Sequence, residues 1–382
     1  MQKICFLSTF PPTKCGIATF TKDLINSIND TKLVIAEVIA INDLVSDYIY
    51  NNDVKLVINK FNIDEYLSSA EYINKHYNIL CLQHEFGLYG GEDGDFLLPF
   101  LEKINIPIIT TFHTILPKPE EYKSSIRNLL RKIVDLSTFV VAMSEQSVEC
   151  LKSVYKCPDN KIHFINHGVP YFDFNEESEY KIKIGLKNDE KMLLMSGLIG
   201  VNKGIEFVIE AMKTITISYP ETKFYIVGQT HPEVIKKNNG QDIYRTFIQE
   251  KSKKLGMENH VIFVNKYLEL DDLLDYFRAT DIYLTPHLDP QQATSGTLAY
   301  AMGAGKICIS TPFQYARNML NNNNGILVPF KNSEAIAQSV MNVFSDKSLF
   351  ERYKKNAYNV GKEMRWPVVA NKYISLFKEM NK

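Results

Sequence analysis

Residues 281–312 read DIYLTPHLDPQQATSGTLAYAMGAGKICISTP, and this stretch decides the fold class. Two short apolar runs within it, Ile282–Thr285 and Ile307–Ser310, have the length and composition of buried strands. A polar loop and a helix that opens at Ser295-Gly296-Thr297 are expected between them. The order strand, helix, strand predicts a parallel sheet with a crossover helix.

The start of this predicted helix is a candidate anion site. The first amides of a helix have no internal partner, and the helix dipole adds roughly half a positive charge there. Ser295 and Thr297 add hydroxyl groups, and Gly296 lets a ligand approach the backbone closely. A phosphate or a diphosphate would suit such a site. On local evidence alone, an ordinary serine N-cap is the favoured explanation.

The same alternation continues on both sides of this stretch and indicates two domains. Short apolar strands and amphipathic helices alternate from Lys3 to Asn166, and a second series runs from Lys191 onward. A polar, irregular segment at residues 171–188 separates the two series. We therefore expect an α/β protein with two doubly wound, Rossmann-like parallel-sheet domains that face a central cleft. The expected domains are residues 1–175 and 176–365, followed by a C-terminal helix at 366–382.

Composition excludes several classes of function. The 382 residues are 45% apolar and 23% charged, with a net charge of −1, so nothing favours general binding to nucleic acid or anionic lipid. The six cysteines form no CxxC pair, which favours reduced thiols and a cytoplasmic location. No run approaches the ~20 apolar residues of a membrane span, although a peripheral membrane contact stays open.

Several candidate residues follow predicted strands of the first half, where parallel sheets bind ligands. His84-Glu85 and His113 each end a predicted strand, and could hydrogen-bond sugar hydroxyls or transfer a proton. A single histidine in such a place is more often structural. Gly16 begins a helix and could admit a phosphate or a sugar, although a turn glycine is the simpler explanation. No zinc-like spacing occurs, so we expect no metal site.

The second half adds Lys203-Gly204 at the entry to a helix after a strand. A lysine there can pair with a diphosphate as a point charge, and a solvated surface lysine is the alternative. With Ser295–Thr297, two strand-end loops of one domain would then face one anion.

Eight pieces of the sequence together resemble a known family. In order, they are FPPTKCGIATF (10–20), LQHEFGLYGGEDG (82–94), TTFHT (110–114), NHGV (166–169), SGLIGVNKGIEFVIEAM (196–212), VGQ (227–229), FRATDIYLTP (277–286) and SGTLAYAMGAGKICISTP (295–312). Their order and spacing resemble the retaining, GT-B-fold nucleotide-sugar glycosyltransferases of family 4 (group 1) over essentially the whole length.

The resemblance implies roles for individual residues. The N-terminal domain would bind the acceptor and the C-terminal domain the nucleotide-sugar donor, and the helix at 366–382 would cross back onto the N-terminal domain. Ser295, Gly296 and Thr297 would offer amides to the donor diphosphate. The other roles it implies are a phosphate partner (Lys203), close approach to the diphosphate (Gly16), contact with the base (Gly228, Lys266, Tyr267) and proximity to the reacting sugar (His113).

The chain departs from the family pattern at two points. The usual Gly-Arg pair before the lysine loop is Gly197-Leu198 here, and Arg317 is a candidate replacement for the missing cation. The two glutamates of the family are replaced by Gln292 and Tyr300, which would still lie at the donor. A tyrosine cannot reproduce the two acceptor oxygens of a carboxylate, so the contact to the ribose must differ.

The expected activity is that of a retaining hexosyltransferase in the EC 2.4 class, of a kind used in polysaccharide biosynthesis. It would need no metal or cofactor and would move a hexose from a UDP- or GDP-sugar to a hydroxyl of a saccharide or glycolipid precursor. His113 and Lys203 would be catalytic, and His84 and Glu85 would bind the acceptor. The alternatives are a nucleotide-sugar epimerase or hydrolase on the same fold, and a non-catalytic protein that binds a sugar or nucleotide.

Overall fold

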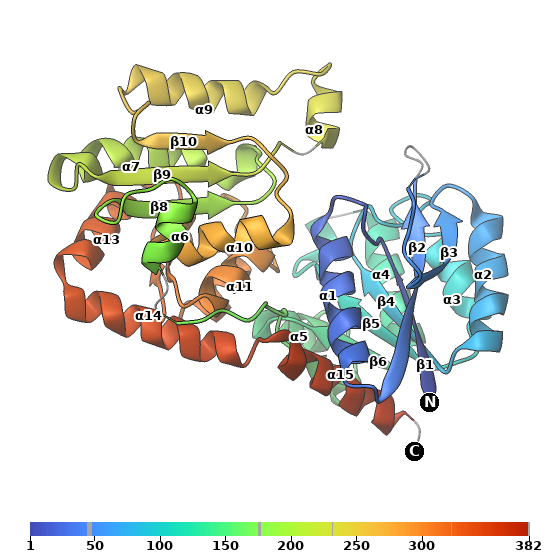
Figure 1. Ribbon diagram of the computed structural model, residues 1–382. Coiled ribbons are helices and arrows are strands. Elements are labelled where there is room, and N and C mark those ends of the chain that lie inside the picture. Colours follow the sequence, from blue (N-terminus) through green and yellow to red (C-terminus); the bar gives the residue numbers. More distant parts are fainter. Residues whose placement is uncertain (44–47, 122, 175–176, 231, 322, 381–382) are drawn as a thin grey trace. The chain divides into compact units, whose positions relative to one another are not determined.

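The computed structural model describes residues 1–43, 48–121, 123–174, 177–230, 232–321 and 323–380 (Figure 1). The chain divides into two compact units, which are described separately. Unit 1 comprises Met1–Gly168 and Met364–Lys382, and unit 2 comprises Val169–Glu363. Each unit is built on a parallel sheet, so the prediction of two α/β, doubly wound halves is confirmed.

Among the described residues, the sheet of unit 1 has seven parallel strands in the order β3-β2-β1-β4-β5-β6-β7. The strands are β1 (Gln2–Ser8), β2 (Val34–Asn42), β3 (Val54–Asn59), β4 (Ile79–His84), β5 (Ile108–Phe112), β6 (Phe139–Ala142) and β7 (Ile162–Phe164). Successive side chains of β1 point to opposite faces, as the pleat of a strand requires. Cys5 and Leu7 enter one apolar layer, and Ile4 and Phe6 enter the other.

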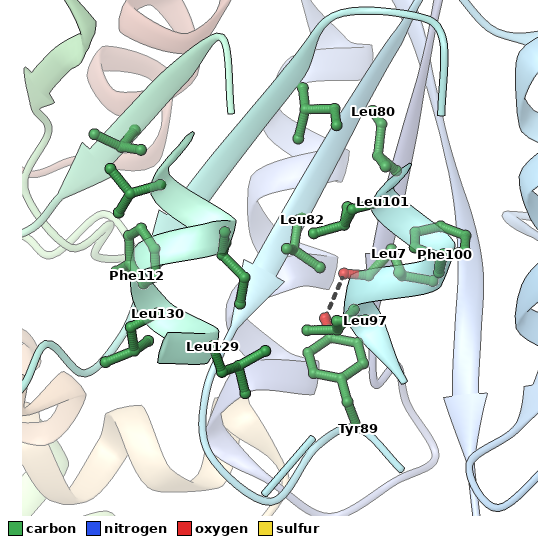
Figure 2. Packing of buried hydrophobic residues seen from close by; sticks show 14 of the residues in the cluster. Leu7, Leu80, Leu82, Tyr89, Leu97, Phe100, Leu101, Phe112, Leu129 and Leu130 are labelled. Atoms are coloured by element: carbon green, nitrogen blue, oxygen red, sulfur yellow. Dashed lines mark hydrogen bonds between the residues drawn. The ribbon is translucent and has the colours of Figure 1, made fainter. Parts of the chain in front are cut away.

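The first layer of unit 1 packs four helices against the sheet. They are α2 (Ile63–His76), α3 (Leu97–Lys103), α4 (Ser124–Leu136) and α5 (Glu145–Ser153). Figure 2 shows Leu82, Leu97 and Leu129 of this layer around the ring of Tyr89. The Tyr89 hydroxyl lies 3.1 Å from Leu7 O and 2.7 Å from Gln83 O. These bonds tie the loop after β4 to the carboxyl edge of the sheet.

The second layer of unit 1 joins the two ends of the chain. It holds α1 (Gly16–Asp30) and the last helix, α15 (Trp366–Glu379), side by side (Figure 1). Phe20 packs its ring edge-on against Trp366 at 5.2 Å, and the Tyr373 hydroxyl lies 2.8 Å from Thr111 Oγ1 in β5. The C-terminal helix therefore completes the core that the first strands begin.

The sheet of unit 2, among the described residues, has six parallel strands in the order β10-β9-β8-β11-β12-β13. They are β8 (Lys191–Ser196), β9 (Thr222–Val227), β10 (Val261–Val264), β11 (Ile282–Thr285), β12 (Ile307–Ser310) and β13 (Ile326–Leu327). The helices are α6 (Glu177–Lys183), α7 (Ile205–Ser218), α8 (Pro232–Lys237), α9 (Ile243–Lys254), α10 (Leu270–Ala279), α11 (Gly296–Gly303), α12 (Gln314–Met319), α13 (Ser333–Ser345) and α14 (Lys347–Lys362).

Helices cover both faces of this second sheet. Helices α7, α9 and α13 pack on the face to which Leu193 and Met195 of β8 point. Helices α11 and α14 pack against each other and against β12. Their backbones come so close that a Cβ on Gly361 would lie 2.6 Å from Gly303 Cα. None of the helices in the described segments is long and apolar enough to span a membrane.

Two helices depart from the sequence-based expectation. Helix α6 lies in the polar segment at 171–188 that we expected to be irregular, and α12 follows β12 without a sequence signal. The polar helix α6 is anchored by charge, because Glu177 at its start accepts hydrogen bonds from Lys306 (2.9 Å) and Lys354 (2.8 Å). Burial alone would raise the pKa of Glu177, but the two ammonium groups outweigh it and lower that pKa to about 2.

This ion triad predicts a pH-dependent stability difference. Glu177→Gln should lower the free energy of unfolding by roughly 3 kcal/mol at pH 7, since it leaves two buried ammonium groups without their carboxylate. The native pKa is depressed, so the stabilisation is complete above the ordinary value of 4.5 and is lost as pH falls toward 2. Urea unfolding followed by circular dichroism measures it, with exposed Glu258→Gln as the control. A constant difference between pH 7 and pH 2 would contradict this account.

Candidate functional site

The order of strands reverses once in each sheet. In unit 1 the reversal lies between β1 and β4, and in unit 2 it lies between β8 and β11. Crossover connections leave such a pair of strands in opposite directions, so a crevice forms beyond their carboxyl ends. The segments that follow these strands are therefore the candidate sites, and they contain Gly16 and Glu85 in unit 1 and Lys203 and Gln292 in unit 2.

The turn that carries Lys203 follows β8. It is a single 3₁₀ turn, Val201–Lys203, and ends at Gly204 in the left-handed region with φ of 64°. Leu288 N donates a hydrogen bond of 2.8 Å to Asn202 O, which holds the turn against the loop after β11. Lys203 is half-buried, and the loss of water lowers its pKa to about 8.

His287 lies in the loop after β11, and its role was not predicted from the sequence. Its side chain is buried, and burial and the charge of Lys203 hold its pKa well below the ordinary value. The ring hydrogen-bonds the Gln292 side chain, whose Nε2 donates to Thr294 O at 2.9 Å. Lys203, His287 and Gln292 therefore form one cluster. A signal existed, because His287 lies two residues after the predicted strand Ile282–Thr285, and His113 likewise lies just beyond the end of a strand.

The first turn of α11 contacts the segment after β8. Ser295 is a conventional N-cap, because its Oγ accepts a hydrogen bond of 3.3 Å from Leu298 N. The Thr297 hydroxyl hydrogen-bonds the Tyr283 hydroxyl, and Thr297 Cγ2 would lie 3.8 Å from a Cβ on Gly197. Both hydroxyls are thus engaged inside the protein. Helix geometry leaves the amides of Gly296 and Thr297 without an internal partner, so the backbone is what this turn offers an anion.

Gly228 follows β9 and contacts the same segment after β8. Its φ is +139°, and a Cβ here would lie 2.0 Å from Gly197 O. The Arg245 guanidinium, from α9, donates to Gly228 O at 2.7 Å and to the Asp242 carboxylate at 3.2 Å. Gly228 is therefore fixed by a close backbone approach on one side and a buried cation on the other.

The remaining residues of unit 2 that were predicted as donor contacts lie in the loop after β10 and on helices α11 and α12. Lys266 is exposed and Tyr267 half-buried in the loop after β10, an edge strand of the sheet. Tyr300 is buried in α11, with its ring edge-on to Phe277 at 5.9 Å. Arg317 is exposed on α12.

In unit 1, Gly16 is the exposed first residue of α1, just beyond β1. Cys15 caps this helix, with its Sγ accepting from Ala18 N at 3.3 Å. A Cβ on Gly16 would meet no atom within 4 Å. The start of α1 is therefore open to a ligand, in contrast to the backbone around Gly228.

Three histidines of unit 1, His84, His113 and His167, are buried and neutral. His113 Nε2 lies 3.0 Å from Gln83 Oε1, and His113 N donates to His84 O at 3.0 Å. Burial, together with His167 and His84, lowers the pKa of His113 to about 3. Burial also lowers the pKa values of His84 and His167 to about 4 each. These rings are uncharged at neutral pH and act as hydrogen-bonding groups.

Glu85 lies next to this group and is half-buried. Its carboxylate accepts hydrogen bonds of 2.7 Å from Phe86 N and from Thr114 Oγ1. Burial raises its pKa above the ordinary value. The structure thus brings His84, Glu85 and His113 together at the carboxyl edge of unit 1.

Comparison with known proteins identifies the family. Residues 176–360 match the family model described as glycosyl transferases group 1, and residues 93–171 match that of glycosyltransferase family 4. The chain belongs to the group 1 glycosyltransferases. The chain is 27% identical over 262 residues to an uncharacterized glycosyltransferase of Methanocaldococcus jannaschii. The match covers 64% of the chain and 61% of that relative, so the chain spans about three fifths of the relative's length.

Solved structures share the fold of this chain. Sucrose-phosphate synthase from Thermosynechococcus elongatus matches with a TM-score of 0.78 at 16% identity, and 100% of this chain and 99% of that one are covered. HepE from Anabaena, solved in complex with UDP and glucose, matches with a TM-score of 0.74 at 15% identity, and 99% of this chain and 100% of that one are covered. The predicted GT-B fold class is therefore confirmed.

Gly228 and Gly16 give a matched pair of substitutions. Gly228→Ala should lower the free energy of unfolding by at least about 2 kcal/mol, because the new Cβ meets Gly197 O and the backbone is left-handed. Gly16→Ala should change it by less than about 0.5 kcal/mol, since the space around it is open. Urea unfolding measures both variants, and equal stability of the two would contradict the close backbone approach.

The neutral histidines predict that unit 1 loses stability in mild acid. Their native pKa values are depressed, so the unfolded chain binds more protons below its ordinary value of 6.5. Between pH 7 and pH 5, each ring should lower the free energy of unfolding by about 1–2 kcal/mol. Trp366, the one tryptophan of the chain, packs in unit 1 and reports its unfolding. His113→Gln should lower the number of protons taken up on unfolding by about one, which flattens the pH dependence of the free energy of unfolding. Substitution of an exposed histidine, His76→Gln, should leave that pH dependence unchanged.

Proposed function

We propose that this protein is a retaining, metal-independent hexosyltransferase that uses a UDP- or GDP-sugar as donor. One observation carries the proposal. At the carboxyl edge of unit 2, the first turn of α11 lies against the segment after β8, which also carries the Lys203 turn. A helix N-terminus and a lysine on neighbouring loops suit a diphosphate better than any neutral ligand.

The chemistry asks for stabilisation of a leaving diphosphate. As the bond from the sugar to the diphosphate breaks, negative charge grows on the leaving oxygen, and fixed amides and a cation stabilise it. The amides of Gly296 and Thr297 and the ammonium of Lys203 would fill these roles without rearrangement. Because Lys203 is half-buried, its charge is screened less by water than that of an exposed lysine.

The same arrangement supports retention of configuration. The positions of the family's two glutamates are held by Gln292 and Tyr300, and neither can act as a carboxylate nucleophile. The leaving phosphate would then take the proton of the acceptor hydroxyl on the same face of the sugar. The neutral His113 would hydrogen-bond sugar hydroxyls rather than supply a charge. HepE, which shares the fold, was solved with UDP and glucose, so UDP-glucose is the first donor to test.

Donor binding should depend on Lys203 and on pH. Lys203→Ala and Gly296→Val should each weaken UDP- or GDP-sugar binding and turnover at least tenfold, since they remove the cation or block the approach to the amides. With a free-enzyme pKa of about 8, Lys203 is mostly neutral at pH 9, so affinity should fall up to about tenfold between pH 7 and pH 9. Isothermal calorimetry and nucleotide release measure both effects.

The matched control is Lys213→Ala, which removes an exposed lysine from α7, the helix that follows the Lys203 turn. It should retain wild-type affinity and its pH dependence. Wild-type behaviour of Lys203→Ala would contradict the placement of the diphosphate. Donor turnover in the absence of any acceptor would instead indicate an epimerase or a hydrolase.

A further inference from the structure

A pocket in unit 1 lies beside the loop that follows His84 and Glu85. Its volume is about 520 Å³, within the range of small-ligand sites. Its walls come from the loops after β3, β4 and β5 and from α4, so it opens at the carboxyl edge of the sheet. The lining residues are Lys60, Phe61, Phe86, Gly87, Tyr89, Gly90, Gly91, Asp93, Gly94, Leu116 and Ile126.

The wall of this pocket is preformed. A Cβ on Gly90 would lie 1.7 Å from Lys60 O, so the loop after β4 rests directly on the turn after β3. Gly90 N also donates a hydrogen bond of 3.1 Å to the Tyr66 hydroxyl. Tyr89 is fixed by the contacts of its hydroxyl to Leu7 O (Figure 2) and to Gln83 O. A ligand would therefore enter an existing site and would not have to order the loop first.

The side chains of the pocket wall offer apolar surface rather than free hydrogen-bonding groups. The Lys60 ammonium donates to Gly87 O, and Asp93 accepts a hydrogen bond of 3.0 Å from Ser125 Oγ. The Tyr89 hydroxyl is directed to backbone carbonyls, so the charged and phenolic side chains of the wall already have protein partners. The remaining side chains are aromatic or aliphatic. A sugar ring needs convergent polar groups, whereas an alkyl chain needs apolar surface of this kind.

Phe61 adds a second, independent observation. It follows β3 and remains 65% exposed although it lines the pocket. The Lys60 ammonium lies 5.6 Å from the centroid of its ring, which orients the ring without covering it. A large aromatic side chain beside a concave apolar wall is typical of a surface that a ligand covers.

We propose that this pocket binds the hydrocarbon chain of a lipid-linked acceptor, such as an acyl or isoprenoid chain. The loop that lines it begins directly after Glu85, so the headgroup that bears the reactive hydroxyl lies at the same sheet edge as His84, Glu85 and His113. That the bound lipid is an acceptor rests on the proposed function, but binding of the hydrocarbon chain can be measured without turnover.

The test uses decyl β-maltoside below its micelle concentration, titrated into the full-length protein by calorimetry, with maltose as the headgroup alone. Decyl maltoside should bind at least about 100-fold more tightly than maltose. Removing two methylenes should weaken binding by up to about 16-fold, at up to about fourfold per methylene. Binding that is independent of chain length would overturn the proposal.

Substitutions in the pocket test whether the hydrocarbon chain of decyl maltoside binds there. Phe61→Ala and Ile126→Glu should each weaken decyl maltoside binding at least tenfold, one by removing ring surface and the other by placing a charge in the wall. Phe164→Ala is the matched control, because Phe164 is 43% exposed on β7 of the same unit and does not line the pocket. Phe61 is exposed, so its variant keeps the fold and decides the outcome if Ile126→Glu does not fold. Unchanged binding in Phe61→Ala would overturn the proposal.

Failure of this inference is distinguishable from failure of the proposed function. Phe61→Ala should bind the UDP- or GDP-sugar with wild-type affinity, since Phe61 belongs to unit 1 and Lys203 to unit 2. Loss of donor binding in Lys203→Ala with intact decyl maltoside binding would support both sites. Binding of decyl maltoside without any binding of the donor would support the pocket and contradict the transferase reaction.

Discussion

The reversal of strand order in each sheet is the constraint on which the candidate sites depend. Parallel strands place their carboxyl ends at one edge, and a crevice opens there where the connections diverge. The open start of α1 and Glu85 lie beyond the carboxyl ends of β1 and β4. Lys203 and the loop of His287 lie beyond those of β8 and β11. Residues far apart in the sequence become neighbours through this topology rather than through any single motif.

The two edges differ in their electrostatics. At the edge of unit 1 the rings of His84 and His113 are buried and uncharged at neutral pH, and the adjacent pocket is apolar. At the edge of unit 2 the half-buried Lys203 is mostly protonated at pH 7, beside the open amides of a helix. A neutral, hydrogen-bonding edge suits a sugar or lipid hydroxyl, and a cationic edge suits a diphosphate. This contrast agrees with the division of substrates in the proposed transferase.

The sequence predicted the strands Ile282–Thr285 and Ile307–Ser310 with the bounds that the structure gives them, because buried parallel strands are uninterrupted apolar runs. It did not predict α6, whose polar sequence has no apolar stripe and whose anchoring by Glu177 requires lysines more than a hundred residues away. On local evidence Ser295 was expected to be an ordinary N-cap, and the hydrogen bond that its Oγ accepts from Leu298 N confirms this expectation. His287 lies near Lys203 because the hydrogen bond from Leu288 N to Asn202 O joins their two loops. No local sequence pattern predicts that bond.

The return of α15 to unit 1 has a consequence for synthesis on the ribosome. The chain emerges from its N-terminus, so residues 1–168 are complete long before the helix that covers α1 exists. At about 5–20 residues per second, the making of unit 2 separates these events by roughly 10–40 s. During that interval the apolar side of α1, including Phe20 and Leu24, lacks its final cover. The unit whose synthesis begins first is thus the last to complete its core.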